Sequence, residues 1–155
     1  MMNQNEVDVL GEIQEYLVVN LADELYAIPG IAVREVMRWQ TPTSVPGAPA
    51  IMPGLISQRG VIFPVIDLRL MLGLTLTPST RATRLVLVEH DVTRMALLVD
   101  NVVDLVPLTI KSITPPPAAL EAQRVRLLAG VTILEGATLA VLNLGALVAA
   151  LHETL

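Results

Sequence analysis

Side chains that could carry out chemistry are few and scattered in this sequence of 155 residues. It has no cysteine and only two histidines, His90 and His152, and neither stands in a motif with a second ligand or base. The four serines, at positions 44, 57, 79 and 112, lie outside any Gly-x-Ser-x-Gly context. The glycines at positions 47, 54 and 60 are not followed by the Lys-Ser or Lys-Thr of a phosphate loop. We therefore expect no enzyme, and no catalytic, cofactor-binding or metal-binding residue.

One arginine near the middle of the chain stands between two apolar runs. Arg59 is flanked by Gly54 and Gly60 within residues 53–68, and glycine permits a positive φ or the close approach of another backbone. The segment therefore predicts a strand, a tight turn and a second strand. Arginine's rigid fork of donors suits a fixed carboxylate, so we predict that Glu35, an isolated acid among apolar neighbours, approaches Arg59. A solvated turn residue is the alternative.

The amino-acid composition argues against nucleic acid and membranes as partners. The net charge is −5 and there is no run of Lys or Arg, whereas nucleic acid and anionic membrane surfaces require a concentrated basic face. Mean hydropathy is high, at +0.62, but the most apolar stretch, 137–151, is shorter than the roughly 20 residues of a membrane span. The first residues lack the basic and apolar regions of a secretory signal. We expect a cytoplasmic protein that does not insert into membranes.

Turn residues and apolar spacing predict a first half made mainly of strands. Residues 1–14 are polar and irregular and are expected to form a flexible leader. After the leader, the spacing of apolar residues predicts the strands and the helix, and clusters of turn-forming residues predict the connections between them. The expected elements are strands over 16–21 and 25–28, a short helix over 31–37 and an extended crossing segment over 39–49.

The second half repeats the order of the first. A hairpin is predicted from residues 84–89 and 95–99, and residues 100–105 stand where the short helix stood. Asp100 and Asp104 would then share one helical face, which is usually a solvated face. At an offset of 69, Val33-Arg34-Glu35-Val36 matches Val102-Val103-Asp104-Leu105, and at an offset of 76 Gly54 matches Gly130.

This repeat predicts a duplicated small β unit, with chance similarity as the alternative. The halves cover about 15–74 and 83–155, and whether they exchange segments stays open. Short strands joined by turns favour barrels, because closure removes unpaired edges. The spacing of apolar residues at 144, 147, 148 and 151 predicts a closing helix over 144–152.

The central segment resembles the signature of the CheW family of chemotaxis coupling proteins. It reads Pro53-Gly54-Leu55-Ile56-Ser57-Gln58-Arg59-Gly60 and continues as Val61-Ile62-Phe63-Pro64-Val65-Ile66-Asp67-Leu68-Arg69. The usual family form is close to Lys-Gly-Val-Ile-Asn-Leu-Arg-Gly followed by Ile-Pro-Val-Ile-Asp-Leu-Arg. Ser57 and Gln58 replace the usual Asn-Leu, which leaves any role of that asparagine in doubt here. The resemblance covers nearly the whole chain outside the leader.

The resemblance implies a mostly β fold, with two five-stranded SH3-like or OB-like barrels side by side, short helices and a C-terminal helix in one domain over 15–155. It implies a non-catalytic adaptor in two-component signalling. The implied partners are the CheW-like regulatory domain of a CheA-type histidine kinase and the cytoplasmic tip of chemoreceptors. The expected partner-binding residues are Val33, Glu35, Gly54, Arg59 and Gly60 from the resemblance, with Val102 and Leu105 added from the repeat.

Three alternatives remain open from the sequence. A small barrel could carry an apolar ligand, although small barrels are usually filled by their own side chains. A weak enzyme is the second alternative. The third is an adaptor of a pilus-based or transcriptional chemosensory pathway, because nothing in the residues identifies the receptors or the output.

Overall fold

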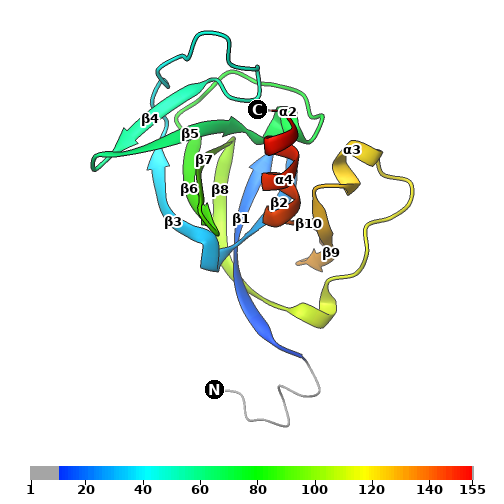
Figure 1. Cartoon of the computed structure of the whole chain (residues 1–155). Coiled ribbons are helices and arrows are strands. Elements are labelled where there is room, and N and C mark those ends of the chain that lie inside the picture. The colour runs from blue at the N-terminus through cyan, green and yellow to red at the C-terminus, as the bar shows by residue number, and fades with distance from the viewer. Residues whose placement is uncertain (1–10, 155) are drawn as a thin grey trace.

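The computed structural model describes residues 11–154, and strands dominate it (Figure 1). The predicted mostly β fold class is confirmed. The short helical elements are η1 (Gly30–Ala32), α2 (Leu68–Met71), η2 (Ile110–Ser112) and α3 (Ala122–Val125), and α4 (Leu144–Thr154) closes the chain. The strands are β1 (Ile13–Leu21), β2 (Glu24–Pro29), β3 (Val33–Arg38), β4 (Gly54–Gln58), β5 (Val61–Asp67), β6 (Arg84–His90), β7 (Thr93–Val99), β8 (Asn101–Thr109), β9 (Leu128–Leu134) and β10 (Ala137–Leu142).

The strands form two five-stranded sheets. Sheet A has the order β8-β1-β2-β10-β9, and sheet B has the order β3-β6-β7-β5-β4. Sheet B is built from the continuous stretch 33–99, whereas sheet A combines the segments before and after it. Sheet A thus joins the β1–β2 hairpin of the first predicted half to three strands of the second half. Sheet B joins the β6–β7 hairpin of the second half to three strands of the first half.

Strand register repeats between the sheets. The pairing of β3 with β6 has a bulge at Arg34, and the pairing of β8 with β1 has a bulge at Val103, 69 residues later. Each sheet also contains one parallel pair, β2 with β10 in sheet A and β7 with β5 in sheet B. A bulge turns the strand locally, so both sheets bend at matching places.

Two glycines match between the sheets in the same way. A Cβ on Gly54 would meet the backbone carbonyl of Thr43, and a Cβ on Gly130 would meet that of Thr114. Each threonine forms an isolated β-bridge to the residue that follows its glycine. Glycine is therefore required at both positions, because each crossing segment packs directly on the strand backbone.

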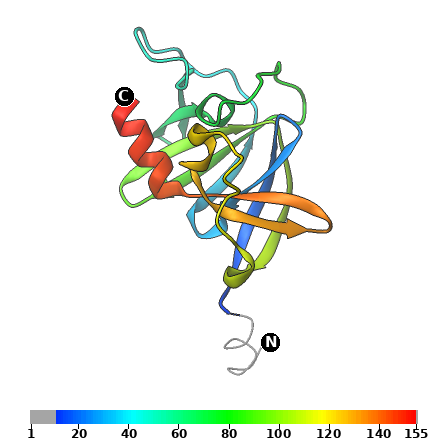
Figure 2. The ribbon, with the colours of Figure 1, turned by 90° about the vertical axis from the view of Figure 1, so that its right-hand side faces the viewer.

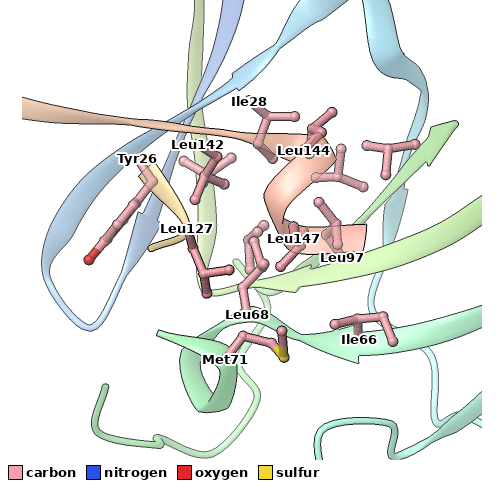
Figure 3. Close-up of a cluster of buried hydrophobic side chains, with 14 of the residues drawn as sticks. Tyr26, Ile28, Ile66, Leu68, Met71, Leu97, Leu127, Leu142, Leu144 and Leu147 are labelled. Carbon is pink, nitrogen blue, oxygen red and sulfur yellow. The ribbon is translucent and has the colours of Figure 1, made fainter. Parts of the chain in front are cut away.

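Three buried clusters hold the sheets together. One is shared by both sheets and α4, and Figure 3 labels Tyr26, Ile28, Ile66, Leu68, Met71, Leu97, Leu127, Leu142, Leu144 and Leu147 in it. The other two lie within the individual sheets, and all five strands of each sheet contribute to its cluster. Each sheet consequently curls around its own apolar side chains, as a small barrel does.

The C-terminal helix α4 agrees with its prediction. It begins after Asn143, whose side-chain Oδ1 accepts a hydrogen bond of 3.0 Å from the backbone of Ala146, an N-cap. Its buried residues include Leu144, Leu147 and Leu151, and Figure 2 shows it starting directly after β10. Between residues 11 and 154 the fold contains no helix that is long and apolar enough to cross a membrane.

Two predicted helices are wrong, and both segments are strands. In place of the helix predicted over 31–37, the chain forms the short turn η1 and then strand β3, which pairs with β6. Residues 101–105 belong to β8, which pairs with β1 along its length. In both cases the neighbouring strand supplies backbone partners that outweigh a weak local helical spacing.

The start of the fold also differs from the prediction. Strand β1 begins at Ile13, two residues before the predicted start of the fold at Glu15, because Ile13 and Gln14 pair with the end of β8. These two residues therefore belong to the sheet and not to the expected leader 1–14. Residues 11 and 12 of the predicted leader are also described, and the Glu12 carbonyl accepts a 2.8 Å hydrogen bond from the backbone of Ile110. Residues 1–10 lie outside the described residues.

Candidate partner-binding surface

The tip of the β4–β5 hairpin presents Arg59. Gln58 pairs with Val61, which leaves a two-residue turn at Arg59 and Gly60 with φ of 52° and 77°. Positive φ at both central residues is the geometry of a type I′ hairpin turn, so the predicted strand, turn and strand are confirmed. The Arg59 side chain is 81% exposed, and Figure 1 shows the hairpin extending from sheet B.

Glu35 of β3 lies next to this tip, as predicted. Its Oε1 is 3.9 Å from Nη2 of Arg59. Nε2 of Gln58 is closer, and donates to both carboxylate oxygens at 3.2 Å. The Glu35 side chain is 33% exposed, so the ion pair with Arg59 is of the surface kind, which contributes about 0 to 1 kcal/mol.

A groove of about 720 Å³ runs beside Glu35, between β3 and the strands β1 and β8. Val33, Val36, Leu105 and Ile31 are its apolar lining residues beside Leu17, and Ile31 is 86% exposed. The structure thus brings three of the expected partner-binding residues, Val33, Glu35 and Leu105, into one depression. The remaining lining residues are Glu12, Gln14, Glu15, Leu17 and Gly30, so carboxylates border an apolar surface.

Two expected partner-binding residues lie elsewhere. Gly54 is buried, and a Cβ there would stand 2.7 Å from the carbonyl carbon of Thr43. In the structure, Gly54 therefore allows the crossing segment that contains Thr43 to pack against β4. Val102 is half-buried and packs against the cluster shared by the sheets. Contact of either residue with a partner stays a prediction.

Sequence reasoning missed the role of Arg69, which is buried. Its Nε and Nη2 donate to the two carboxylate oxygens of Asp67 at 3.0 Å, and its Nη1 donates to Asp100 at 3.0 Å and to the Thr77 carbonyl at 2.8 Å. Asp100 also accepts a 2.7 Å hydrogen bond from the backbone of Ala22. The hydrogen bond to Asp67 raises the pKa of Arg69, whose side chain is 9% exposed.

This network joins segments that are distant in sequence. It connects the end of β5 to the start of β8 and to the β1–β2 turn, and therefore links sheet B to sheet A. The only local signal was the spacing of Asp67 and Arg69, two residues apart. Nothing in the sequence indicated that Asp100 completes the site.

A second polar cluster holds segment 113–127 against sheet A; Figure 2 shows this segment in yellow. Tyr26 Oη donates to Glu24 at 2.6 Å, and Nη1 of Arg124 lies 3.3 Å from both oxygens of the same carboxylate. Burial, together with the hydrogen bond to Glu24, raises the pKa of Tyr26. Nε of Arg124 is buried and has no hydrogen-bond partner among residues 11–154. In the part of the chain that the structure describes, no three His, Asp or Glu residues gather as a metal site.

Comparison with known proteins identifies the family. The family model described as the CheW-like domain matches residues 15–152. The chain belongs to the CheW family. In this CheW fold, Gln58 occupies one of the two positions where the signature departs from the usual residues, and its amide hydrogen-bonds to Glu35.

Curated and solved relatives agree with this assignment. The chain is 34% identical over 106 residues to the probable chemotaxis protein CheW of Rhizobium etli, with 67% of each chain covered. It is 33% identical over 96 residues to chemotaxis protein CheW of Bacillus subtilis, with 62% of each covered. The crystal structure of scaffolding protein TtCheW from Thermoanaerobacter tengcongensis has a TM-score of 0.78 and 28% identity over 86% of each chain.

Proposed function

We propose that this protein is a non-catalytic adaptor that couples chemoreceptors to a CheA-type histidine kinase in the cytoplasm. Relatives that cover two thirds or more of the chain are named chemotaxis proteins, and the solved relative is described as a scaffolding protein. The observation that carries the proposal is the groove between the sheets, which places Val33, Glu35 and Leu105 on one surface beside the Arg59 tip.

The groove suits a helical partner. Helix-in-groove recognition requires an apolar concave surface that accepts a stripe of side chains from one helix face. The lining residues Ile31, Val36 and Leu105 are exposed, and their apolar side chains supply such a surface. We assign this groove to the tip of the receptor hairpin, and one barrel to the regulatory domain of the kinase.

A carrier function is not favoured, because the insides of both sheets are filled. The side chains of Val18 and Leu139 in sheet A, and of Val65 and Leu85 in sheet B, are 0% exposed. A barrel interior packed in this way leaves no space for an apolar ligand.

The groove is tested by titrating the protein with a receptor-tip fragment and, separately, with the kinase regulatory domain of the same organism. Leu105→Asp places a charge on the apolar lining and is expected to weaken receptor binding about tenfold or more. The matched control is Ile133→Asp, at a 67% exposed position of β9 outside the groove. Equal receptor affinity of the two variants, with unchanged melting temperatures, would contradict the assignment of the groove.

A further inference from the structure

Arginines gather at the end of β3, on a depression separate from the groove proposed for the receptor. Arg38, Trp39, Arg81 and Arg84 line a hollow of about 630 Å³, together with Ser79 and Thr80. None of these residues lines the groove described above. We refer to Arg38, Arg81, Arg84 and Trp39 as the arginine patch.

Among residues 11–154, the arginines of this patch have no carboxylate partner. Residues 33–99 contain seven arginines, and four of them have a carboxylate within 4.0 Å: Arg34, Arg59, Arg69 and Arg94. The other three, Arg38, Arg81 and Arg84, have no carboxylate of residues 11–154 within this distance, and all three line the hollow.

Strand pairing places two of these arginines directly opposite one another. Arg38 of β3 and Arg84 of β6 are direct partners in the register, and like charges opposite one another destabilise a sheet. An anion bound between them would remove this repulsion. The register therefore favours a bound anionic group over an empty hollow.

Hydrogen bonds hold part of the patch in place before any ligand binds. Nη1 of Arg84 donates to the carbonyls of Arg81 at 2.6 Å and Thr83 at 2.9 Å. The Thr83 hydroxyl in turn accepts a 2.8 Å hydrogen bond from the backbone of Thr80. Trp39 packs against the cluster inside sheet B. A preorganised site loses less conformational entropy on binding.

The wider charge distribution indicates the kind of anion. Residues 33–99 have seven arginines against four carboxylates, whereas the rest of the described chain has nine carboxylates against three basic residues. Long polyanions such as nucleic acid or an anionic membrane would meet this surrounding negative charge. A short acidic segment would contact the patch alone.

We propose that the arginine patch binds an acidic segment of a partner protein, with carboxylates on the three guanidinium groups and an apolar side chain on Trp39. Carboxylates match the fork geometry of arginine, and the indole ring supplies the adjacent apolar surface. This surface is separate from the proposed receptor groove, so either proposal can fail without the other.

The test uses Trp39 as its own reporter, because it is the only tryptophan of the chain. The full-length protein is titrated with the peptide Gly-Glu-Glu-Leu-Glu-Glu-Gly, and with the same peptide carrying Gln for every Glu. We expect a saturable change in Trp39 emission with the Glu peptide, at a Kd below about 1 mM, and none with the Gln peptide. Pyrophosphate and phosphatidylglycerol vesicles serve as probes for other anions.

A charge-matched pair of variants locates the site. Arg38→Gln with Arg81→Gln is expected to raise the Kd about tenfold, since both residues would contact carboxylates. The control, Arg34→Gln with Arg94→Gln, removes the same charge from sheet B at arginines already paired with Glu89, and is expected to change the Kd less than about threefold. Arg81→Gln alone, in an exposed loop, serves if the double variant fails to fold.

Three results would overturn the proposal. The first is no response of the wild type to the Glu peptide. The second is an equal loss of affinity in both double variants, which would indicate diffuse attraction. The third is binding of pyrophosphate or vesicles without binding of the peptide.

Discussion

Nε2 of Gln58 donates to both carboxylate oxygens of Glu35 at 3.2 Å, across the space between β4 and β3. Arg59, one residue further along the hairpin, is only 3.9 Å from the same carboxylate and is 81% exposed. The neutral amide therefore holds Glu35 in place, while the guanidinium is largely solvated. Glu35 and Arg59 lie together as charges available to a partner.

The Glu35–Arg59 pair is expected to add little to stability. A double-mutant cycle with Glu35→Ala and Arg59→Ala should give a coupling energy below about 1 kcal/mol, because the pair is solvent-exposed. The measurement is urea unfolding of the wild type, both single variants and the double variant. A coupling of about 3 kcal/mol or more, typical of a buried pair, would show that the two charges are sequestered from water.

Arg69 is expected to matter far more. Arg69→Met leaves Asp67 and Asp100 without their shared partner, and should lower the free energy of unfolding by about 3 to 5 kcal/mol. Arg34→Met, which removes an exposed partner of Glu89, is the control and should cost less than about 1 kcal/mol. Similar unfolding midpoints in urea for the two variants would be inconsistent with a buried network.

Gly54→Ala and Gly130→Ala should destabilise the fold to a similar degree. In each case the added methyl group meets the carbonyl of a crossing segment, and overpacking of this kind costs about 1 to 3 kcal/mol. Gly136→Asn is the control, because its φ of 82° is tolerated by asparagine and no atom lies within 4 Å of the new Cβ. Melting temperatures of Gly54→Ala and Gly130→Ala that match the control would refute the close packing.

Tyr26 should make the fold sensitive to alkaline pH. Burial and its hydrogen bond to Glu24 raise the pKa of Tyr26 above the ordinary value of 10.0. Above about pH 10 the unfolded chain loses the phenolic proton while the folded chain keeps it, so the free energy of unfolding falls as pH rises. Below that pH the contribution is fully present.

The variant Tyr26→Phe lacks this proton and should lose less stability than the wild type as the pH rises above about 10. Near neutral pH it should be about 1 to 2 kcal/mol less stable, because the hydrogen bond to Glu24 is gone. Urea unfolding at several pH values measures both effects. Parallel pH profiles for the two proteins would exclude a role for Tyr26 ionisation.

The central hairpin could be predicted because its determinants are local. Gly60 follows Arg59 at a turn that requires positive φ at both residues, and apolar runs on either side specify the strands. The C-terminal helix was predictable for the same reason, since Leu144, Leu147 and Leu151 share one helical face. Local periodicity was enough for both elements.

Features that depend on distant pairing could not be predicted. Strand β3 has apolar positions near helical spacing, and only its pairing with β6 makes it extended. The buried site of Arg69 depends on Asp100, which is 31 residues away. The groove likewise forms because Leu105 of β8 is brought close to Val33 of β3, and that proximity follows from how strands of the two halves combine in each sheet.

Kinase coupling tests the central claim most directly. Autophosphorylation of the CheA-type kinase of the same organism is measured with receptor-containing membranes, with and without this protein. We expect strong, concentration-dependent stimulation that requires all three components and that Leu105→Asp reduces while Ile133→Asp does not. Kinase activity that is unchanged by the wild-type protein in the presence of its own receptors would contradict the adaptor function.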